Sequence, residues 1–451
     1  MKIAICASEV VPFAKTGGLA DVTGALPFTL EALGHEVIII MPGYKQIPDK
    51  KSVIGKNIRV YFIENDAYFG RDGLYGDKKG DYKDNLKRFS YYCKESLKLL
   101  KEIGFTPDII HCHDWQSALI PVYMKTIYAN DPFYRGVKTV FTIHNLGYQG
   151  LFPKEEFPEL GLDWKYFDVD TLEFFGRVNL LKGGIVFSDL INTVSPTYSK
   201  EIQTKELGFG LEGVLTKRRN RLFGVLNGID YSIWNPATDK IIPAGYSLSD
   251  MNGKMEDKKQ LQQLCGLPLN KDIPLLGIVS RLAEAKGFDL LAQIMDTLCK
   301  MDLQIVILGT GDLKYHKLLS DVAKKYSRVM SLQLKFDDAL AHKIYAGADI
   351  FLMPSSYEPC GLGQLISLRY ATIPVVFKTG GLADTVNASH GFVFKRYKKE
   401  DLMHSLKSAL KAFSDKDKWN KLMVNAMKCD FSWEESAREY VRLYEEAGKP
   451  E

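Results

Sequence analysis

The chain has 451 residues, of which 46% are hydrophobic and 25% are charged, with a formal net charge of +4 at neutral pH. A chain of this length exceeds the size at which one hydrophobic core keeps growing, so we expect two domains. The net charge is small and the lysines are scattered, which excludes the charge pattern of a nucleic-acid-binding or membrane-surface protein.

The seven cysteines form no Cys-x-x-Cys pair and mostly lie inside apolar runs, which is typical of reduced thiols. No apolar run has membrane-spanning length, and the first strand follows Met1 with no secretory leader. We therefore expect a soluble, cytoplasmic protein that binds neither nucleic acid nor a membrane.

The opening stretch predicts a strand, a glycine loop and a helix. Ile3–Ala7 is a short apolar run suited to a buried parallel strand, and apolar residues recur at helical spacing from Leu19 to Leu33. Gly17-Gly18 lies between them, where the backbone can approach a ligand closely and the free N–H groups of the helix start favour an anion. Lys15 adds a positive charge at the edge of this loop.

The sequence Lys-Thr-Gly-Gly-Leu-Ala-Asp occurs twice, at Lys15–Asp21 and at Lys378–Asp384, the second time after the apolar run Ile373–Phe377. A single glycine loop before a helix is more often plain turn chemistry than a binding site. Two copies, each between a strand and a helix, instead predict two similar α/β domains that each present a glycine loop.

A second apolar run, His35–Pro42, completes a strand-helix-strand unit and so predicts a parallel sheet with right-handed crossovers. The polar segment 69–85 predicts an irregular loop. The remaining elements expected in this domain are strands at 58–62, 108–115, 137–145 and 190–196, and helices at 88–103 and 176–185.

Polar residues follow two of these strands: His111, His113 and Asp114 end one, and His144 and Asn145 end the other. Ligands of open parallel sheets bind outside the carboxyl ends of the strands, so these residues are candidates for a binding site. His-x-His-Asp also offers metal ligands, but it has no acidic companion cluster, and we favour hydrogen bonding over a metal.

Asp168 and Asp170 form an Asp-x-Asp pair of the kind that holds a metal in many sugar-nucleotide transferases. They lie among aromatic residues in a loop or helix start, and we interpret them as a solvated cap. The polar stretch from 235 to about 257 predicts the connection between the domains, and we place the boundary at residue 240.

The second domain repeats the plan, with strands expected at 273–280, 303–308, 348–355 and 373–377. Arg281 and Lys286 lie just past the first of these strands. Glu358 lies between a strand end and a predicted helix start, where an acid meets backbone N–H groups and a ligand could do the same.

These motifs together resemble the bacterial glycogen synthases and plant starch synthases, over essentially the whole chain. The motifs that carry the resemblance are Lys15–Val22, His111-x-His113-Asp114-Trp115, His144-Asn145-Leu146, Asn227–Asp230, Ser280-Arg281-Leu282 with Lys286-Gly287, Glu358–Leu362 and Thr379–Leu382. The resemblance implies an α/β fold of the GT-B type, in which two Rossmann-like domains, 1–240 and 241–430, have parallel sheets that face each other across a deep cleft. It also implies a C-terminal segment, 431–451, whose helix crosses back to the first domain.

The function implied by the resemblance is transfer of glucose from ADP-glucose to the non-reducing end of an α-1,4-glucan, glycogen or starch, with retention of configuration (EC 2.4.1.21). No metal or other cofactor is implied, because fixed cations and N–H groups can stabilise the departing diphosphate. One rival is a retaining GT-B enzyme that uses a UDP- or GDP-sugar, and the first glycine loop disfavours it. The other is a non-catalytic glucan-binding homologue, and the intact Lys15, Arg281, Lys286 and Glu358 argue against it.

Carried over residue by residue, the resemblance implies two sets of site residues. Arg281 and Lys286 are similar to the pair that holds the donor pyrophosphate, and Phe336 stands where the family usually has a tyrosine near the adenine. Gly363 stands where the family usually has a threonine. The implied catalytic residues are Lys15, His144, Arg281, Lys286 and Glu358, and the implied donor-binding residues are Gly18, Asp21, Asp114, Asn145, Asn227, Phe336, Cys360, Gly361, Leu362, Thr379, Gly380 and Gly381.

Overall fold

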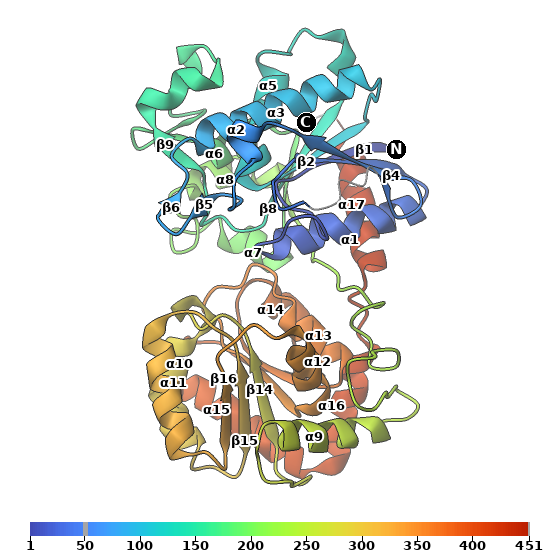
Figure 1. The fold of residues 1–451 in the computed structure, drawn as a ribbon, viewed down its shortest axis with the longest axis vertical. Helices are drawn as coiled ribbons and strands as arrows, with labels where there is room; N and C mark the ends of the chain where they lie inside the picture. The colour runs from blue at the N-terminus through green and yellow to red at the C-terminus, as the bar shows by residue number, and fades with distance from the viewer. Residues whose placement is uncertain (48–52, 450–451) are drawn as a thin grey trace. The chain divides into compact units, whose positions relative to one another are not determined.

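The computed structural model describes residues 1–47 and 53–449. The chain forms two compact α/β units (Figure 1). The first unit is Met1–Asn227 together with the C-terminal segment that begins at Trp433, and the second is Gly228–Ser432. The junctions between the units therefore follow residues 227 and 432, where the sequence alone led us to expect 240 and 430. Residues 450 and 451, at the end of the expected C-terminal segment, lie outside the described residues.

The first unit is built on an eight-stranded sheet with the order β13-β12-β8-β7-β1-β2-β4-β3. All neighbouring pairs are parallel except β3 with β4. The strands are nearly continuous apolar runs because helices cover both faces of the sheet. Their bounds are β1 (Lys2–Cys6), β2 (Glu36–Pro42), β3 (Val53–Ile54), β4 (Ile58–Ile63), β7 (Ile109–His113), β8 (Lys138–Ile143), β12 (Leu190–Thr193) and β13 (Leu222–Gly224).

Two helices from opposite ends of the described chain pack side by side in this unit, α1 (Gly18–Ala32) and α17 (Trp433–Ala447) (Figure 1). α17 also contacts β8, so the C-terminal helix is part of the first unit's core. The other helices are α2 (Asp66–Phe69), α3 (Asn85–Glu102), α4 (Asp114–Ser117), α5 (Leu119–Lys125), α6 (Leu180–Phe187), α7 (Pro196–Glu201) and α8 (Glu212–Lys217), with short 3-10 turns at Pro132–Tyr134, Lys154–Leu160, Trp164–Tyr166 and Arg219–Arg221.

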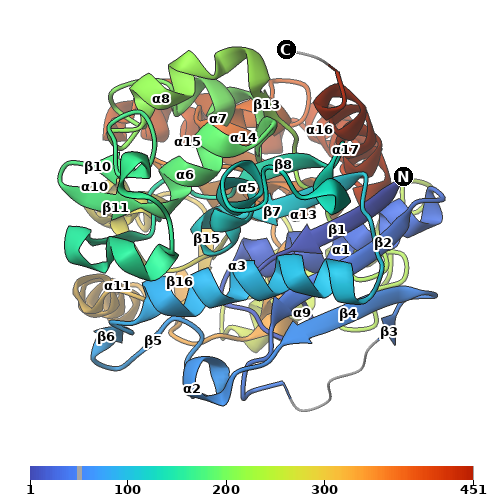
Figure 2. The same cartoon turned by 90° about the horizontal axis from the view of Figure 1, so that it is seen from above.

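Among these, α5 packs against both α3 and α6, and α3 also contacts β2 and β4 (Figure 2). Two small sheets complete the unit: β5 (Gly76–Asp77) with β6 (Gly80–Asp81), and β9 (Leu151–Pro153) with β10 (Glu173–Phe174) and β11 (Arg177–Asn179). The polar segment 69–85, expected to be irregular, therefore contains the short β5–β6 hairpin.

The second unit has a six-stranded, fully parallel sheet with the order β16-β15-β14-β17-β18-β19. The strands are β14 (Leu275–Val279), β15 (Gln304–Leu308), β16 (Met330–Gln333), β17 (Ile350–Met353), β18 (Ile373–Phe377) and β19 (Phe392–Phe394). The helices are α9 (Asn252–Leu264), α10 (Phe288–Leu298), α11 (Leu313–Lys325), α12 (Asp338–Gly347), α13 (Gly363–Arg369), α14 (Gly380–Thr385), α15 (Lys399–Ser414) and α16 (Lys416–Lys428), with a 3-10 turn at Glu284–Lys286.

Successive residues of each strand face opposite layers of this unit, as the period of two requires. Ile278 and Ile305 pack into the core that α10, α11 and α15 cover, whereas Leu275 and Val306 pack into the core that α9, α12 and α13 cover. The two layers are visible on the two sides of the sheet in Figure 1. Both cores leave the carboxyl ends of the strands to loops.

The chain enters and leaves the second unit along adjacent paths. Ile229 donates its N–H to the carbonyl oxygen of Phe431 at 2.8 Å, and the Tyr231 hydroxyl accepts the Phe431 N–H at 2.9 Å. The segment after residue 231 is fixed to the same unit, because Trp234 stacks on His342 at 3.9 Å between ring centroids. The polar stretch that we expected to link the domains therefore belongs to the second unit.

Two local expectations were wrong. The helix expected at 176–185 begins only at Leu180, because Arg177–Asn179 pairs with β9 as a strand, and Asn179 then caps α6. The strand expected at 108–115 ends at His113, because Asp114 takes a left-handed conformation, with φ of 54°, and opens α4.

Candidate active site

Glu9 fixes the glycine loop of the first unit. It follows β1, is only 4% exposed, and its carboxylate accepts hydrogen bonds from the Thr16 hydroxyl at 2.7 Å, the Thr16 N–H and the Gly17 N–H at 3.2 Å. No described heavy atom outside the neighbouring residues lies within 4 Å of a Cβ position at Gly17 or Gly18, so the face of the loop is open to a ligand. Sequence reasoning assigned Glu9 no role, although a carboxylate directly after a parallel strand is a usable signal.

Tyr75 completes the support of this loop from the segment that the sequence left unplaced. Its hydroxyl donates to Glu9 at 2.6 Å and lies 2.7 Å from the Ser8 hydroxyl. Burial raises the pKa of Tyr75 well above its ordinary value, so it remains a neutral donor. The 69–85 segment therefore packs over the carboxyl end of β1.

Lys15 and Asp21 form an ion pair at 2.7 Å across the open face of the loop. Their side chains are 55% and 33% exposed, so the pair is solvated and contributes little to stability. Asp21, which the resemblance implies as a donor-binding residue, thus compensates the charge of Lys15. A bound phosphate would compete with Asp21 for the lysine.

The polar residues after β7 and β8 lie together, as their positions at neighbouring strand ends require. His113 Nδ1 is 2.9 Å from His144 Nε2, and the His144 N–H donates to the Asp114 carboxylate at 2.7 Å. Asn145 follows directly, and its amide oxygen accepts the Gly147 N–H at 2.9 Å. The structure brings Asp114, His144 and Asn145 into one cluster at the carboxyl edge of the first sheet.

Burial sets the protonation of this cluster. It lowers the pKa of His144 to about 3 and that of His113 well below its ordinary value, so both imidazoles are neutral. Burial also raises the pKa of Asp114 to about 7, against the effect of the His144 and Asn145 N–H groups and with a further upward contribution from the Glu9 charge. Asp114 therefore changes charge near neutral pH.

Replacing Asp114 with Asn is expected to raise the free energy of unfolding more at about pH 8 than at about pH 4. The folded chain keeps the Asp114 proton up to about pH 7, whereas the unfolded carboxyl loses it near pH 3.9, so the stability of the natural chain falls through this window by at most about 1.4 kcal/mol per pH unit. Asn has no charge to bury and tolerates a positive φ. Urea unfolding across this range measures the difference, and a gain that does not grow with pH would contradict it.

In the second unit, three loops follow the carboxyl ends of the neighbouring strands β14, β17 and β18. Lys286 from the first loop pairs with Glu358 from the second, Nζ to Oε2, at 2.5 Å, and their side chains are 22% and 9% exposed. The backbone joins the same loops, since the Ser356 N–H donates to the Ala285 carbonyl at 3.0 Å. Lys286 and Glu358 thus hold each other at this edge of the sheet.

Arg281 is exposed on the loop after β14, and its guanidinium has no hydrogen-bond or ion-pair partner within residues 1–47 and 53–449. The backbone on either side is fixed, because the Leu282 N–H donates to the Thr310 carbonyl at 3.0 Å. A Cβ at Gly309 would lie 1.9 Å from the Ser280 carbonyl oxygen, so only glycine lets the loop after β15 approach this closely. The backbone position of Arg281 is thereby fixed while its charge stays available.

The loops after β17 and β18 are packed backbone to backbone. A Cβ at Gly380, where φ is 41°, would lie 2.0 Å from the Glu358 carbonyl oxygen, and one at Gly381 would lie 2.1 Å from the Cys360 carbonyl oxygen. The Gly381 N–H donates to the carbonyls of Glu358 and Pro359, and the Thr379 N–H donates to Phe377. The Gly381 N–H therefore holds the two loops together, and the Thr379 N–H bonds within its own loop, whereas the resemblance implies both residues as donor-binding.

Gln364 holds the backbone of the Cys360–Leu362 segment and was missed by sequence reasoning. Its amide nitrogen donates to the carbonyls of Cys360 and Gly361 at 3.0 Å each. Gly361 needs the left-handed region, with φ of 74°. At Gly363, where the resemblance implies a threonine, a Cβ would lie 3.0 Å from the Phe351 ring, so a side chain here would require the ring to shift.

Two of the expected site residues lie outside these clusters. Phe336 follows β16 and is 91% exposed, so its ring face is presented to solvent. Asn227 is the last residue of the first unit, is buried, and has an amide oxygen without a hydrogen-bond partner in the described part of the chain.

Metal and membrane features can be described only for the residues with described positions. Within them, no group of three or more His, Cys, Asp or Glu side chains is arranged to hold a metal ion. The Asp170 N–H donates to the Asp168 carboxylate at 2.9 Å and Asp170 pairs with Lys217 at 3.1 Å, so the two aspartates lie in a solvated turn. No helix in this part of the chain is both long and apolar enough to span a bilayer.

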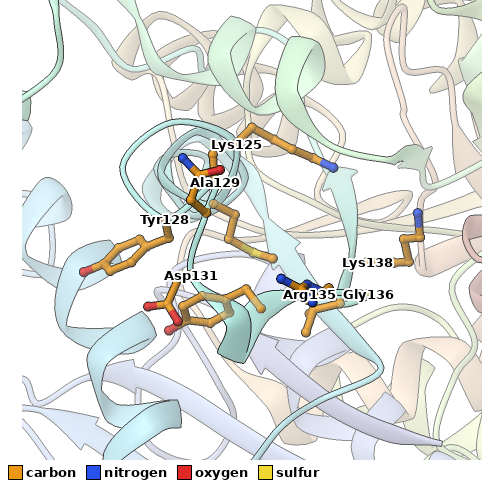
Figure 3. Close-up of a pocket in the computed structure, with 11 residues that line it drawn as sticks. Lys125, Tyr128, Ala129, Asp131, Arg135, Gly136 and Lys138 are labelled. Carbon is orange, nitrogen blue, oxygen red and sulfur yellow. The ribbon is translucent and has the colours of Figure 1, made fainter.

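A cavity of about 350 Å³ lies elsewhere in the first unit, between the end of α5 and the start of β8 (Figure 3). Lys125, Tyr128, Asp131 and Arg135 line it, and Lys138, the first residue of β8, closes one side. Its charges are partly compensated, since Lys125 pairs with Asp189 at 2.8 Å and Asp131 with Lys101 at 2.6 Å. It lies at the amino end of β8, opposite the edge where parallel sheets bind ligands, so we do not assign the donor to it.

Comparison with known proteins identifies the family of this chain. The family model described as "Starch synthase catalytic domain" matches residues 2–217, and that described as "Glycosyl transferases group 1" matches residues 263–422. A glycogen synthase of Geotalea uraniireducens (strain Rf4) is 52% identical, with 98% of each chain covered. A glycogen synthase of Thermotoga maritima (strain ATCC 43589) is 47% identical, with 99% of each chain covered.

The catalytic domain of starch synthase IV from Arabidopsis thaliana, solved with ADP and acarbose bound, has a TM-score of 0.89 and 34% identity, with 99% of each chain covered. Sucrose-phosphate synthase from Thermosynechococcus elongatus has a TM-score of 0.65 at 16% identity, covering 99% of this chain and 98% of its own, and shows the fold alone. The two parallel-sheet units are thus those of the GT-B glycosyltransferases, which confirms the expected fold class. The chain belongs to the glycogen and starch synthase family.

Proposed function

We propose that this chain is a glycogen synthase, which transfers glucose from ADP-glucose to the non-reducing end of an α-1,4-glucan with retention of configuration. The observation that carries the proposal is the edge of the second sheet. There Arg281, which has no side-chain partner among the described residues, shares the loop after β14 with Lys286, and Lys286 pairs with Glu358. Breaking the bond from glucose to a diphosphate concentrates negative charge on the departing phosphates. Cations already fixed in place stabilise that charge without reorganising.

The donor phosphates are assigned to Arg281 and Lys286. A guanidinium can donate two parallel hydrogen bonds to a phosphate, and Arg281 has no internal partner to give up within the described residues. Lys15 is proposed as a further cation, on the open glycine loop with Gly18 beside it. Because the Gly381 N–H bonds to the Glu358 and Pro359 carbonyls, the proposed part of the Thr379–Gly381 turn is to hold the Glu358 loop.

The glucose has its own set of proposed neighbours. Glu358 is proposed beside the anomeric carbon, where a carboxylate stabilises the positive charge of an oxocarbenium-like state. The reaction needs no protein nucleophile if the glucan hydroxyl attacks from the face that the diphosphate leaves. The other proposed neighbours of the sugar are Asp114, His144, Asn145, Asn227, Cys360, Gly361 and Leu362.

The base of the donor is assigned to the exposed ring of Phe336, with Asp21 as a proposed partner of the adenosine. Stacking of a base on an aromatic side chain is worth about 1–3 kcal/mol, and adenine offers two fused rings where uracil offers one. The Arabidopsis starch synthase IV structure holds ADP, the leaving group that this proposal requires, which supports the adenine nucleotide.

We expect the chain to use ADP-glucose in preference to UDP-glucose, by about tenfold or more in kcat/KM, which corresponds to about 1.4 kcal/mol of stacking and contact energy. The measurement is incorporation of radiolabelled glucose from each donor into precipitated glycogen. Phe336→Ala tests the stacking assignment. Because the ring is almost fully exposed, folding should be unchanged, and the ratio of kcat/KM for ADP-glucose to that for UDP-glucose should fall.

Equal or better use of UDP-glucose would contradict the assignment of the nucleotide and favour a UDP-sugar transferase. Glycogen binding without incorporation from either donor would instead indicate a homologue that binds glucan and has lost turnover.

A further inference from the structure

A row of buried polar side chains connects the C-terminal helix to the candidate sugar-binding cluster within the first unit. The Tyr444 hydroxyl of α17 lies 2.9 Å from His111 Nδ1, and His111 Nε2 lies 2.7 Å from the Thr142 hydroxyl. The His111 ring lies against His113, with 4.1 Å between the ring centroids, and His113 reaches His144. His111 is thus fixed at both nitrogens, whereas His113 is fixed at one.

His113 is fully buried, yet its Nε2 atom has no hydrogen-bond partner in the described part of the chain. A buried polar atom without a partner costs about 1–3 kcal/mol, and an apolar side chain of similar size would avoid this cost. His113 is therefore not simply a satisfied core residue. The one side-chain interaction that an apolar residue could not replace is the hydrogen bond between His113 Nδ1 and His144 Nε2, at 2.9 Å.

The bond between the two rings joins one donor to one acceptor, because burial keeps both imidazoles neutral. If His113 donates from Nδ1, its buried Nε2 is an unpaired acceptor. If His144 donates instead, the proton of His113 lies on Nε2 as an unpaired buried N–H. Unpaired buried N–H groups are rarer in proteins than under-satisfied acceptors, so the first arrangement is favoured.

The opposite side of His144 is available to a ligand. The ring is only partly buried, and its Nδ1 atom has no hydrogen-bond partner among residues 1–47 and 53–449. When His113 donates to Nε2, the single proton of the neutral His144 ring must be on Nδ1. His144 then offers a hydrogen-bond donor, which matches a sugar or phosphate oxygen and cannot accept a proton from one.

We propose that His113 is a positioning residue, which donates to His144 Nε2 and so holds His144 as the tautomer that presents an Nδ1–H donor to an oxygen of the bound glucosyl donor. The identity of that ligand rests on the proposed function, whereas the tautomer can be observed in the ligand-free protein. The tautomer of a functional histidine is commonly set by the hydrogen bond that its other nitrogen makes.

The test compares two substitutions of His113. Asn places an amide nitrogen where Nδ1 lies and can still donate to His144, whereas Leu fills the space without donating. Spectra of the full chain with ¹⁵N-labelled histidine, assigned by a His144→Gln variant, report which nitrogen of His144 carries the proton. We expect Nδ1 to be protonated in the natural chain and in His113→Asn, and that preference to be lost in His113→Leu.

Glucosyl transfer gives the second readout. We expect His113→Leu to lower kcat by about 10- to 100-fold with the donor KM little changed, as loss of the orienting partner of a functional histidine does elsewhere, and His113→Asn to restore most of it. Tyr444→Phe is the matched control, because it removes a hydrogen bond from the same cluster and leaves the His113–His144 bond intact. It should lower the melting temperature without changing the His144 tautomer or kcat.

Protonation of His144 on Nε2 in the natural chain would overturn the proposal, whatever the activity. Normal kcat and an unchanged tautomer in His113→Leu would also overturn it, as would an equal loss of kcat in Tyr444→Phe, which would indicate general loosening of the core. If the natural chain transfers no glucose and His144 carries its proton on Nδ1, the tautomer is supported and the proposed function is the part that fails.

Discussion

Replacing Arg281 with Met is expected to lower kcat by about 10²- to 10³-fold, which corresponds to about 2.7–4 kcal/mol of lost transition-state stabilisation. The phosphate charge that Arg281 meets grows as the glycosidic bond breaks, so the contact strengthens toward the transition state and its loss appears in kcat. Replacing Arg281 is easier to interpret than replacing Lys286, because removal of Lys286 would also leave the buried Glu358 without its ion-pair partner.

The control for this variant is Arg328→Met. Arg328 is also exposed and also has no partner within the described residues, but it precedes β16 and so lies at the amino end of the second sheet. Steady-state kinetics and thermal melting of both variants separate the two positions. Neither should change the melting temperature, and only Arg281→Met should lose activity. A rise in the donor KM with kcat preserved would make Arg281 a ground-state binding residue and contradict the proposed role.

Replacing Glu358 with Gln is expected to lower kcat by about 10²-fold or more, with the donor KM little changed. Gln keeps the size and hydrogen-bonding capacity of Glu but removes its charge, so the variant separates charge stabilisation at the anomeric carbon from binding of a sugar hydroxyl. The Glu358 charge can stabilise positive charge effectively, because the residue is only 7% exposed and water shields it weakly.

Lys286 must be considered in the same experiment, since its ammonium lies 2.5 Å from Glu358 and the variant leaves it facing a neutral amide. Glu284→Gln is a suitable control, because Glu284 pairs with Lys314 at 3.2 Å from the same loop as Lys286 but is largely exposed. Its kcat should stay normal. A Glu358→Gln variant with near-normal kcat and a raised donor KM would assign Glu358 to binding and overturn its catalytic role.

The sheets could be predicted from the sequence because buried parallel strands are short, continuous apolar runs. Ile3–Ala7 and Ile373–Phe377 needed no information beyond their own composition, and the structure confirms a strand in each. Arg177–Asn179 could not be recognised in this way. It is a strand because it pairs with β10 on one side and with β9 on the other, and a strand of three residues is too short to leave a period in the sequence.

Some of the candidate site residues could be predicted from the sequence in the same way, and others could not. The glycine loops, Arg281 and Lys286 stand out as local patterns behind strands, so the sequence predicts where they lie. Glu9 and Gln364 act through the loops that they hold. Their partners are only a few residues away in sequence, but the bonds depend on the conformation of each loop, which no periodicity in the sequence encodes. The sequence also did not show that the Gly381 N–H bonds to the Glu358 carbonyl. Whether this N–H binds a phosphate or that carbonyl depends on how closely the two loops pack.

The return of α17 to the first unit has a consequence for the order in which the protein can fold during synthesis. Asn192 and His111 lie in strands made early, but the tyrosines that contact them, Tyr440 and Tyr444, are made after the entire second unit. The second unit is continuous in sequence and can fold as soon as Ser432 has left the ribosome. The unit that is started first is therefore completed only after the second unit has been made, and its largest sheet must wait, incompletely covered, for α17.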